Sequence, residues 1–199
     1  MFKINQGKSG SFVGGLRPGA AAEPLDDAAK RLIAHHWHQV EERTGQPFDH
    51  RFFEREGWVY DTELPAIAVV AMRDLNEIAA LPFFFRLQQA FYAERVDITD
   101  PAEYPALVAD FDVDAEQFGR LLGSAEAKQA AYDDFATARR FGITGFPTLL
   151  LREGDAHHVV TYGYAPADQL EPSLNAWLEA RFGAEVAGEV CSLAGPADC

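Results

Sequence analysis

The sequence predicts an α/β fold in which a small sheet is interrupted by a large all-helical insertion. Short apolar runs with strand character lie at residues 11–16, near the N-terminus, and at residues 147–151 and 157–163, near the C-terminus. The segment from Leu25 to Phe141 instead has helical spacing of its apolar residues and repeated helix-start signals. Because the strands on either side must meet to bury their faces, the helices between them form an insertion.

The helices of the middle segment are predicted one by one from their start and stop signals. Residues 25–45 have apolar positions at helical spacing, acids in the first turn and Gly45 at the end. Thr62 is the expected N-cap of a helix over residues 63–75. Four more helices are expected at residues 81–94, 100–111, 114–123 and 124–142.

The C-terminal part reads as a hairpin followed by a helix. The runs at 147–151 and 157–163 are separated by the turn sequence REGDAH, which is a hairpin signal. A closing helix is expected over residues 166–183, and residues 184–199 form a tail of small residues that we expect to be flexible.

Composition excludes several classes of function. The 199 residues carry a net charge of −14 that is spread along the chain, so neither nucleic acid nor an anionic membrane is expected as a partner. The chain has no run of eighteen apolar residues and no signal-peptide core, so we expect a cytoplasmic protein without a membrane span. The two cysteines, Cys191 and Cys199, exclude a disulfide scaffold.

The stretch TGFPT, residues 144–148, carries the most specific signal. Pro147 opens an apolar run, and a cis bond before it would turn the chain and leave the preceding backbone free to pair elsewhere. A hairpin after such a proline, then a helix, is the C-terminal half of a thioredoxin-like domain. From Phe12 to Phe182 the chain resembles the DsbA-like thiol–disulfide oxidoreductases. The most similar branch is the cytoplasmic one related to FrnE and to 2-hydroxychromene-2-carboxylate isomerases. The stretches that carry the resemblance are GGLRPG, WVYDTELPAIAVV, LQQAFYAE and GITGFPTLLL…YGYAPADQL.

The resemblance implies a domain division and a substrate-binding loop. Residues 11–23 and 140–183 would form the thioredoxin-like portion, and residues 24–139 the helical insertion. The loop would consist of Thr144, Gly145, Phe146 and Pro147, with the residue before the proline offering its backbone to an extended substrate peptide.

The catalytic dithiol of the family has no counterpart in this sequence. Family members carry Cys-x-x-C at the start of their first helix, where one thiolate acts as the nucleophile. This chain has no Cys-x-x-C, so we assign it no catalytic residue. The missing strand, helix and connection would need about 30 residues, and we therefore expect a sheet that is incomplete at its N-terminus and a start site drawn too late. Unpaired strand edges would make the chain poorly soluble or a homo-oligomer.

Two further groups of residues were weighed as sites. Asp61 and Thr62 stand at a helix start, where such residues act as caps, but the resemblance puts this segment beside the substrate cleft, so both are candidates for substrate contact. His35 and His38 share one helix face, with no third ligand evident; we expect solvated or capping histidines and no metal site. Cys191 and Cys199 are either a peripheral redox pair or two ordinary thiols.

The resemblance predicts a DsbA-like thiol–disulfide oxidoreductase family protein that acts on protein or small-molecule thiols and disulfides. The missing dithiol leaves open whether this chain is itself an enzyme. One alternative is a redox-inactive peptide-binding module, which needs no dithiol. A second alternative is a glutathione-dependent isomerase, in which a serine at a helix start would activate glutathione. It is the weaker alternative because neither Ser9 nor Ser11 opens a convincing helix. No resident cofactor is expected, and glutathione is possible as a co-substrate.

Overall fold

The computed structural model describes residues 2–5, 8–153 and 156–182. The chain divides into two compact units. The sheet unit comprises residues 1–12 and 138–199, and the helical unit comprises residues 13–137. Each unit is described by itself.

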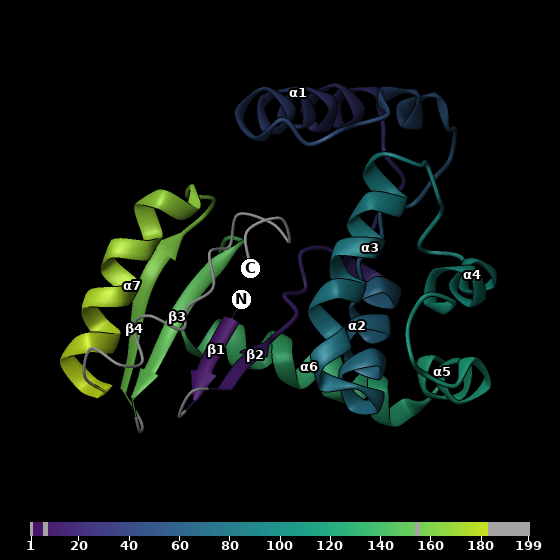
Figure 1. Cartoon of the computed structure of the whole chain (residues 1–199). Helices are drawn as coiled ribbons and strands as arrows, with labels where there is room; N and C mark the ends of the chain where they lie inside the picture. The colour runs from purple at the N-terminus through teal and green to yellow at the C-terminus, as the bar shows by residue number, and fades with distance from the viewer. Residues whose placement is uncertain (1, 6–7, 154–155, 183–199) are drawn as a thin grey trace. The chain divides into compact units, whose positions relative to one another are not determined.

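The sheet unit contains four strands, β1 (Phe2–Asn5), β2 (Lys8–Ser11), β3 (Thr148–Glu153) and β4 (Ala156–Tyr162), in the order β2-β1-β3-β4 (Figure 1). β1 pairs antiparallel with β2 and parallel with β3, and β3 pairs antiparallel with β4. The predicted C-terminal hairpin is thus confirmed. A register shift between Leu149 and Leu150 marks an irregularity in it.

The strand expected at residues 11–16 is not present, because only Ser11 lies in a strand and residues 12–15 have no regular structure. The local contacts explain the difference. The backbone N–H of Val13 donates to the Asp134 carboxylate instead of to a strand. Gly15 lies against the ring of Phe135 so closely that a Cβ would be 2.8 Å from the ring atom Cδ2. This segment therefore packs on a helix and does not join the sheet.

The N-terminal residues form a strand beside β3 that the sequence did not predict. Phe2, Lys3 and Ile4 pair in register with Leu149, Leu150 and Leu151. β3 consequently has a hydrogen-bonded neighbour on each side. The exposed central edges on which we based the expectation of an oligomer are not found among the described strands.

The closing helix α7 (Ala167–Phe182) packs against β4 (Figure 1). It buries Leu174 and Leu178. A separate small core joins the end of helix α6 to the sheet through Ala138, Ile143 and Leu150. These contacts fix the start of β3, whose first residue, Thr148, is the last residue of the TGFPT stretch.

The helical unit contains the helices that the sequence predicts, with ends that differ by a few residues. They are α1 (Asp27–Thr44), α2 (Glu63–Leu75), α3 (Ala80–Tyr92), α4 (Tyr104–Val108), α5 (Ala115–Leu122) and α6 (Ala125–Arg140), of which residues 138–140 belong to the sheet unit. Short 3-10 turns lie at Gly19–Ala21, His50–Glu54, Glu77–Ala79 and Pro101–Glu103. In the described parts of the chain, no helix has the length and apolar character needed to cross a membrane.

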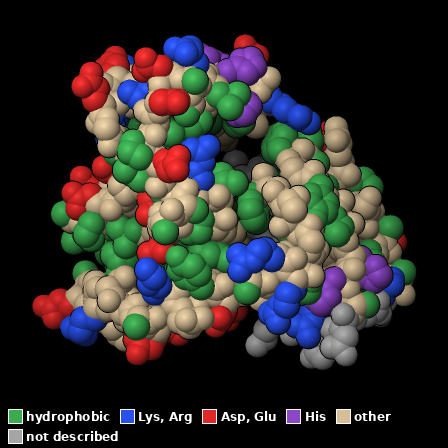
Figure 2. Space-filling model, turned by 180° about the vertical axis from the view of Figure 1, so that it is seen from behind, with side chains coloured by type: hydrophobic (Ala, Val, Ile, Leu, Met, Phe, Trp, Pro, Cys, Tyr) green, Lys and Arg blue, Asp and Glu red, His purple; other side chains and the backbone are tan. Residues whose placement is uncertain are grey.

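The core of the helical unit is built around α2, which buries every residue from Ala66 to Met72. α3 and α5 pack against it, burying Phe83 and Phe118. A second, aromatic cluster centred on Trp37 ties α1 to the turn at His50–Glu54. On the face seen in Figure 2, acidic and basic side chains are interspersed.

Candidate functional site

The loop that the sequence singles out lies in the sheet unit and begins at the end of α6. Gly142, with φ +68°, donates to the carbonyl of Arg139, and Ile143 donates to the carbonyl of Ala138. A positive φ is easily adopted only by glycine, and it lets the chain turn out of the helix. Because Ile143 is buried against Ala138, the next residues leave the core at a fixed point.

The Phe146–Pro147 peptide bond is cis, and three hydrogen bonds hold the loop around it. The Thr148 hydroxyl donates to the Gly145 carbonyl at 2.8 Å. The Gly163 amide donates to the Pro147 carbonyl at 2.7 Å. The Tyr162 hydroxyl donates to the carbonyl of Gly142 at 2.6 Å. These bonds come from inside the loop and from the end of β4.

Phe146 is an exposed apolar residue of the loop. Its side chain is 39% exposed, and Thr144 and Pro147 are exposed beside it. Within residues 2–5, 8–153 and 156–182, no group donates to or accepts from the Phe146 backbone. A backbone N–H and C=O without protein partners can pair with an extended peptide, as an exposed strand edge does. Tyr162 adds a second half-exposed ring next to the loop.

Asp61 and Thr62 lie in the helical unit, at the start of α2, and their side chains bind backbone amides. Asp61 Oδ1 accepts from Gly19 N at 2.9 Å and from Glu63 N at 2.7 Å. Thr62 occupies the N-cap position, but its side chain makes no capping bond. Instead its hydroxyl accepts from Arg17 N at 3.0 Å. The capping role expected of Thr62 therefore falls to Asp61, and both residues fasten the segment 17–19 to the start of α2.

Glu63 forms the main charged cluster at this helix start. Its carboxylate is 2.8 Å from Lys128 Nζ and accepts a hydrogen bond from the Tyr132 hydroxyl. Burial raises the pKa of Glu63, but the hydrogen bonds from Lys128 and Tyr132 outweigh it, so the pKa lies below its ordinary value of 4.5. The same bond to Glu63 raises the pKa of Tyr132. A deprotonated, fully paired carboxylate stabilises the helix start and offers no nucleophile.

The guanidinium of Arg17, which follows the segment packed on α6, lies 5.7 Å from the centre of the Tyr60 ring. This is a cation–π distance. The side chain thus has a structural contact inside the helical unit.

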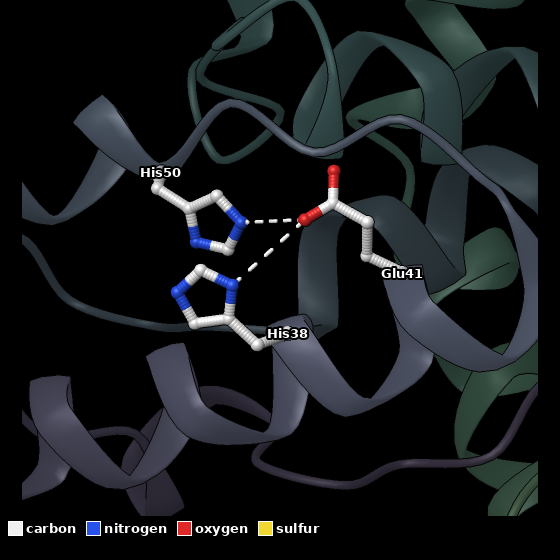
Figure 3. A group of neighbouring side chains, drawn as sticks. All are labelled: His38, Glu41 and His50. Atoms are coloured by element: carbon white, nitrogen blue, oxygen red, sulfur yellow. Dashed lines mark hydrogen bonds and ion pairs between the residues drawn. The ribbon is translucent and has the colours of Figure 1, made fainter.

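Of the two histidines weighed in the sequence, His38 gains partners that the sequence did not suggest. His38 lies beside Glu41 of the same helix and His50 of the following turn, and the three ligand atoms lie within 4.8 Å of one another (Figure 3). Sequence reasoning missed His50 because it lies beyond the end of α1. The aromatic sequence FDHRFF, which packs on Trp37, is the signal that could have placed it.

No described residue is a cysteine, and Cys191 and Cys199 lie outside the described residues together with the tail 184–199. The prediction on their pairing is therefore untested. The loop consequently offers groups for binding, and no thiol is described beside it.

Comparison with known proteins agrees with this architecture. The family model described as DSBA-like thioredoxin domain matches residues 27–175. A crystal structure from Nitrosomonas europaea, provisionally described as a protein disulfide isomerase, is 33% identical, has a TM-score of 0.77, and aligns over 84% of this chain and 80% of that one. The cytosolic disulfide reductase DsbM from Pseudomonas aeruginosa has the same fold, with 24% identity, a TM-score of 0.69, and coverage of 85% and 83%. A structure of DsbM with GSH gives a TM-score of 0.67.

Two curated relatives are described as ClpXP adapter protein SpxH. The Bacillus subtilis protein is 25% identical over 121 residues, which cover 60% of this chain and 40% of the relative. The Bacillus licheniformis protein is 27% identical over 140 residues, which cover 68% and 46%. The chain thus spans less than half the length of these two relatives.

Proposed function

Because the chain belongs to the DSBA-like thioredoxin domain family, we propose that it is a thiol–disulfide oxidoreductase family protein whose Thr144–Pro147 loop binds substrate polypeptide next to a cysteine. One observation carries the proposal. The loop is fixed by hydrogen bonds around a cis Phe146–Pro147 bond, while the Phe146 backbone stays unpaired among the described residues. A fixed, unpaired segment binds an extended peptide without first having to be ordered.

The loop residues perform the binding step in this proposal. The Phe146 N–H and C=O pair with the substrate backbone, and the exposed rings of Phe146 and Tyr162 cover its side chains. Thiol–disulfide exchange itself needs a thiolate that attacks a disulfide sulfur, forms a mixed disulfide and is then displaced by a second thiol. The 199 residues contain no Cys-x-x-C, so we derive no exchange step from them. The intact mass of the native product would show whether the same polypeptide carries a dithiol.

Asp61 and Thr62 have a supporting role in the proposal. Asp61 Oδ1 accepts from the amides of Gly19 and Glu63, and the Thr62 hydroxyl accepts from the amide of Arg17. They hold this segment in place, and the proposal does not need them to touch substrate.

A binding experiment tests the loop directly. The isotope-labelled chain would be titrated with an extended peptide that contains one S-methylated cysteine, which mimics a substrate sulfur without redox chemistry. We expect the amide signals of Gly145, Phe146 and Thr148 to shift, and Phe146→Ala to weaken binding. Ile78→Ala is the matched control, because Ile78 is an exposed apolar residue of the helical unit. Equal affinity of the two variants would overturn the proposal.

A second candidate function is a redox-inactive binding module. It is favoured by the absence of a dithiol from the 199 residues and by the description of two relatives as adapter proteins. A module would bind polypeptide at the same loop without needing cysteine. Replacing the methylated cysteine of the peptide by serine separates the two: a large loss of affinity favours the oxidoreductase family role, and unchanged affinity favours the module.

The proposal extends to partners and location. We place the protein in the cytoplasm, as the description of DsbM as cytosolic suggests, and take protein thiols and disulfides as its partners. Glutathione is the candidate small-molecule co-substrate, because a DsbM structure holds GSH. Fractionation and a titration with glutathione would test these two points.

A further inference from the structure

Three side chains of the helical unit converge near the end of α1, outside the loop discussed above. His38 and Glu41 lie on α1, and His50 begins the next turn (Figure 3). Glu41 Oε2 is 3.0 Å from His50 Nε2 and 3.9 Å from His38 Nδ1. The two imidazole rings stack, with centroids 3.9 Å apart and planes inclined by 13°. The carboxylate oxygen thus faces one nitrogen of each ring.

The backbone that carries these residues is well fixed. His38 and Glu41 are three residues apart, so they share a helix face. Gly45, with φ +70°, ends α1, and the Asp49 amide then donates to the Tyr92 carbonyl at 2.7 Å. Asp49 in turn caps the turn that begins with His50.

Aromatic packing next to the cluster fixes the same elements from the other side. Trp37, which precedes His38, is buried against Phe52 and Phe53, with ring centroids 5.2 Å and 4.7 Å away. Both phenylalanines belong to the turn that carries His50. The three groups are therefore brought together by the fold.

The spacing of the three atoms matches the first shell of a small metal ion. Zinc binds nitrogen and oxygen ligands at about 2.0–2.1 Å, so two ligands of a tetrahedral site are about 3.3 Å apart. The observed separations of 3.0 Å and 3.9 Å bracket this value, and the remaining pair lies within 4.8 Å. Since the His38 side chain is 59% exposed, it can rotate to close the longer distances. The exposed side also leaves room for a water ligand.

The chemistry of the donors selects the kind of ion. His50 Nδ1 is buried and has no hydrogen-bond partner among the described residues, so Nε2 is the ring nitrogen that a ligand can reach. Glu41 adds one carboxylate oxygen, Oε2, which faces a ring nitrogen of each histidine. Imidazole nitrogens suit zinc and its neighbours, whereas calcium and magnesium prefer all-oxygen sites.

We propose that His38, Glu41 and His50 form a binding site for a zinc-class divalent cation, with a fourth position open to water. Two histidines and one glutamate with an open position are a known zinc ligand set. The ion would take the place of the hydrogen bond between His50 and Glu41 and would clamp α1 to the turn at His50–Glu54. The site is independent of the peptide-binding loop, so each proposal can fail without the other.

The test is a zinc titration against a chromophoric chelator of known affinity. It would use the full chain with Cys191→Ser and Cys199→Ser, so that the thiols do not compete. We expect one zinc ion per chain, with affinity falling at least tenfold in His50→Ala and in Glu41→Gln. His36→Ala is the matched control, because His36 is exposed on the same helix but is not in the cluster. Figure 2 shows histidines gathered over this part of the chain, so the control is needed.

Two further readouts keep the result independent of folding defects. Without metal, the variants should unfold within a few degrees of the parent. Zinc should raise the unfolding temperature of the parent and of His36→Ala, but not that of His50→Ala or Glu41→Gln. Cobalt substitution should give the absorption of a nitrogen and oxygen site. Equal zinc affinity in His50→Ala and His36→Ala would overturn the proposal, as would the absence of zinc binding to the parent.

Discussion

Asp134 offers the sharpest test of how the helical unit is held together. Its side chain is 7% exposed. The carboxylate lies 2.8 Å from Arg73 Nη1 and accepts the Val13 amide at 3.1 Å. Asp134→Ala removes the charge and leaves the guanidinium and the amide without this acceptor. Breaking one side of a buried ion pair costs about 3–5 kcal/mol. Arg73 is 24% exposed, so water can partly solvate it. We therefore expect Asp134→Ala to lower the free energy of unfolding by about 3 kcal/mol, at the low end of that range.

The assay is urea unfolding followed by tryptophan fluorescence in a Trp177→Phe background, so that the signal comes from Trp37 and Trp58 of the helical unit. Asp134→Asn keeps an oxygen for the Val13 amide and should lose less than Asp134→Ala. Asp133→Ala is the matched control, since Asp133 is an exposed neighbour on the same helix, bonded to Gln129. Its effect should stay within about 0.5 kcal/mol. A loss below about 1 kcal/mol for Asp134→Ala would refute the reasoning.

Three shorter predictions follow from other contacts. Gly15→Ala puts a Cβ 2.8 Å from a ring atom of Phe135 and should destabilise the helical unit by about 1–3 kcal/mol. Gly119→Ala, in open space on a helix, should instead stabilise the helical unit by about 0.5–1 kcal/mol. The same urea assay would measure both changes. Because the pKa of folded Glu63 is lowered, its stabilisation is present above pH 4.5 and is lost as the pH falls through the folded value. The stability gap between the parent and Glu63→Gln should thus narrow below pH 4.5, and a gap that widens there contradicts the assignment. Tyr162→Phe removes the bond that braces the cis-proline loop and should weaken peptide binding about threefold, in line with the net value of one hydrogen bond; calorimetry that finds unchanged affinity would rule out this brace.

The helices were predictable because their signals are local. Gly45 ends α1 as expected, with the left-handed backbone that a glycine there supplies. The error at residues 11–16 arose because Val13 and Gly15 take their conformation from a helix more than a hundred residues away. The pairing of β1 with β3 is equally long-range. Four residues that include a lysine and an asparagine carry little strand signal by themselves.

The candidate sites show the same contrast between local signals, which the sequence reveals, and long-range contacts, which it does not. Thr144, Gly145, Phe146 and Pro147 could be singled out because the motif is contiguous and specific. The exchange of capping roles between Asp61 and Thr62 could not be predicted, because it depends on the distant amides of residues 17–19. The place of His50 beside His38 could not be predicted for a related reason. Its distance from His38 is set by the packing of Trp37 and not by spacing along the chain.

The way the loop is held has a consequence for substrate choice. The three bonds that hold the loop around the cis bond end on the main-chain carbonyls of Gly142, Gly145 and Pro147. The groups proposed for peptide pairing are likewise main-chain groups, those of Phe146. Main-chain pairing supplies affinity to almost any extended sequence, whereas side-chain pockets supply specificity. Selectivity at this loop must therefore come from the few exposed side chains, chiefly the rings of Phe146 and Tyr162.

A peptide library with one fixed cysteine would test this consequence. In an extended peptide alternate side chains point to the same side, so only positions that face the two rings should prefer apolar residues. The positions between them should tolerate most substitutions. A strong preference for charged residues at every position would mean that a different surface of the protein selects the substrate.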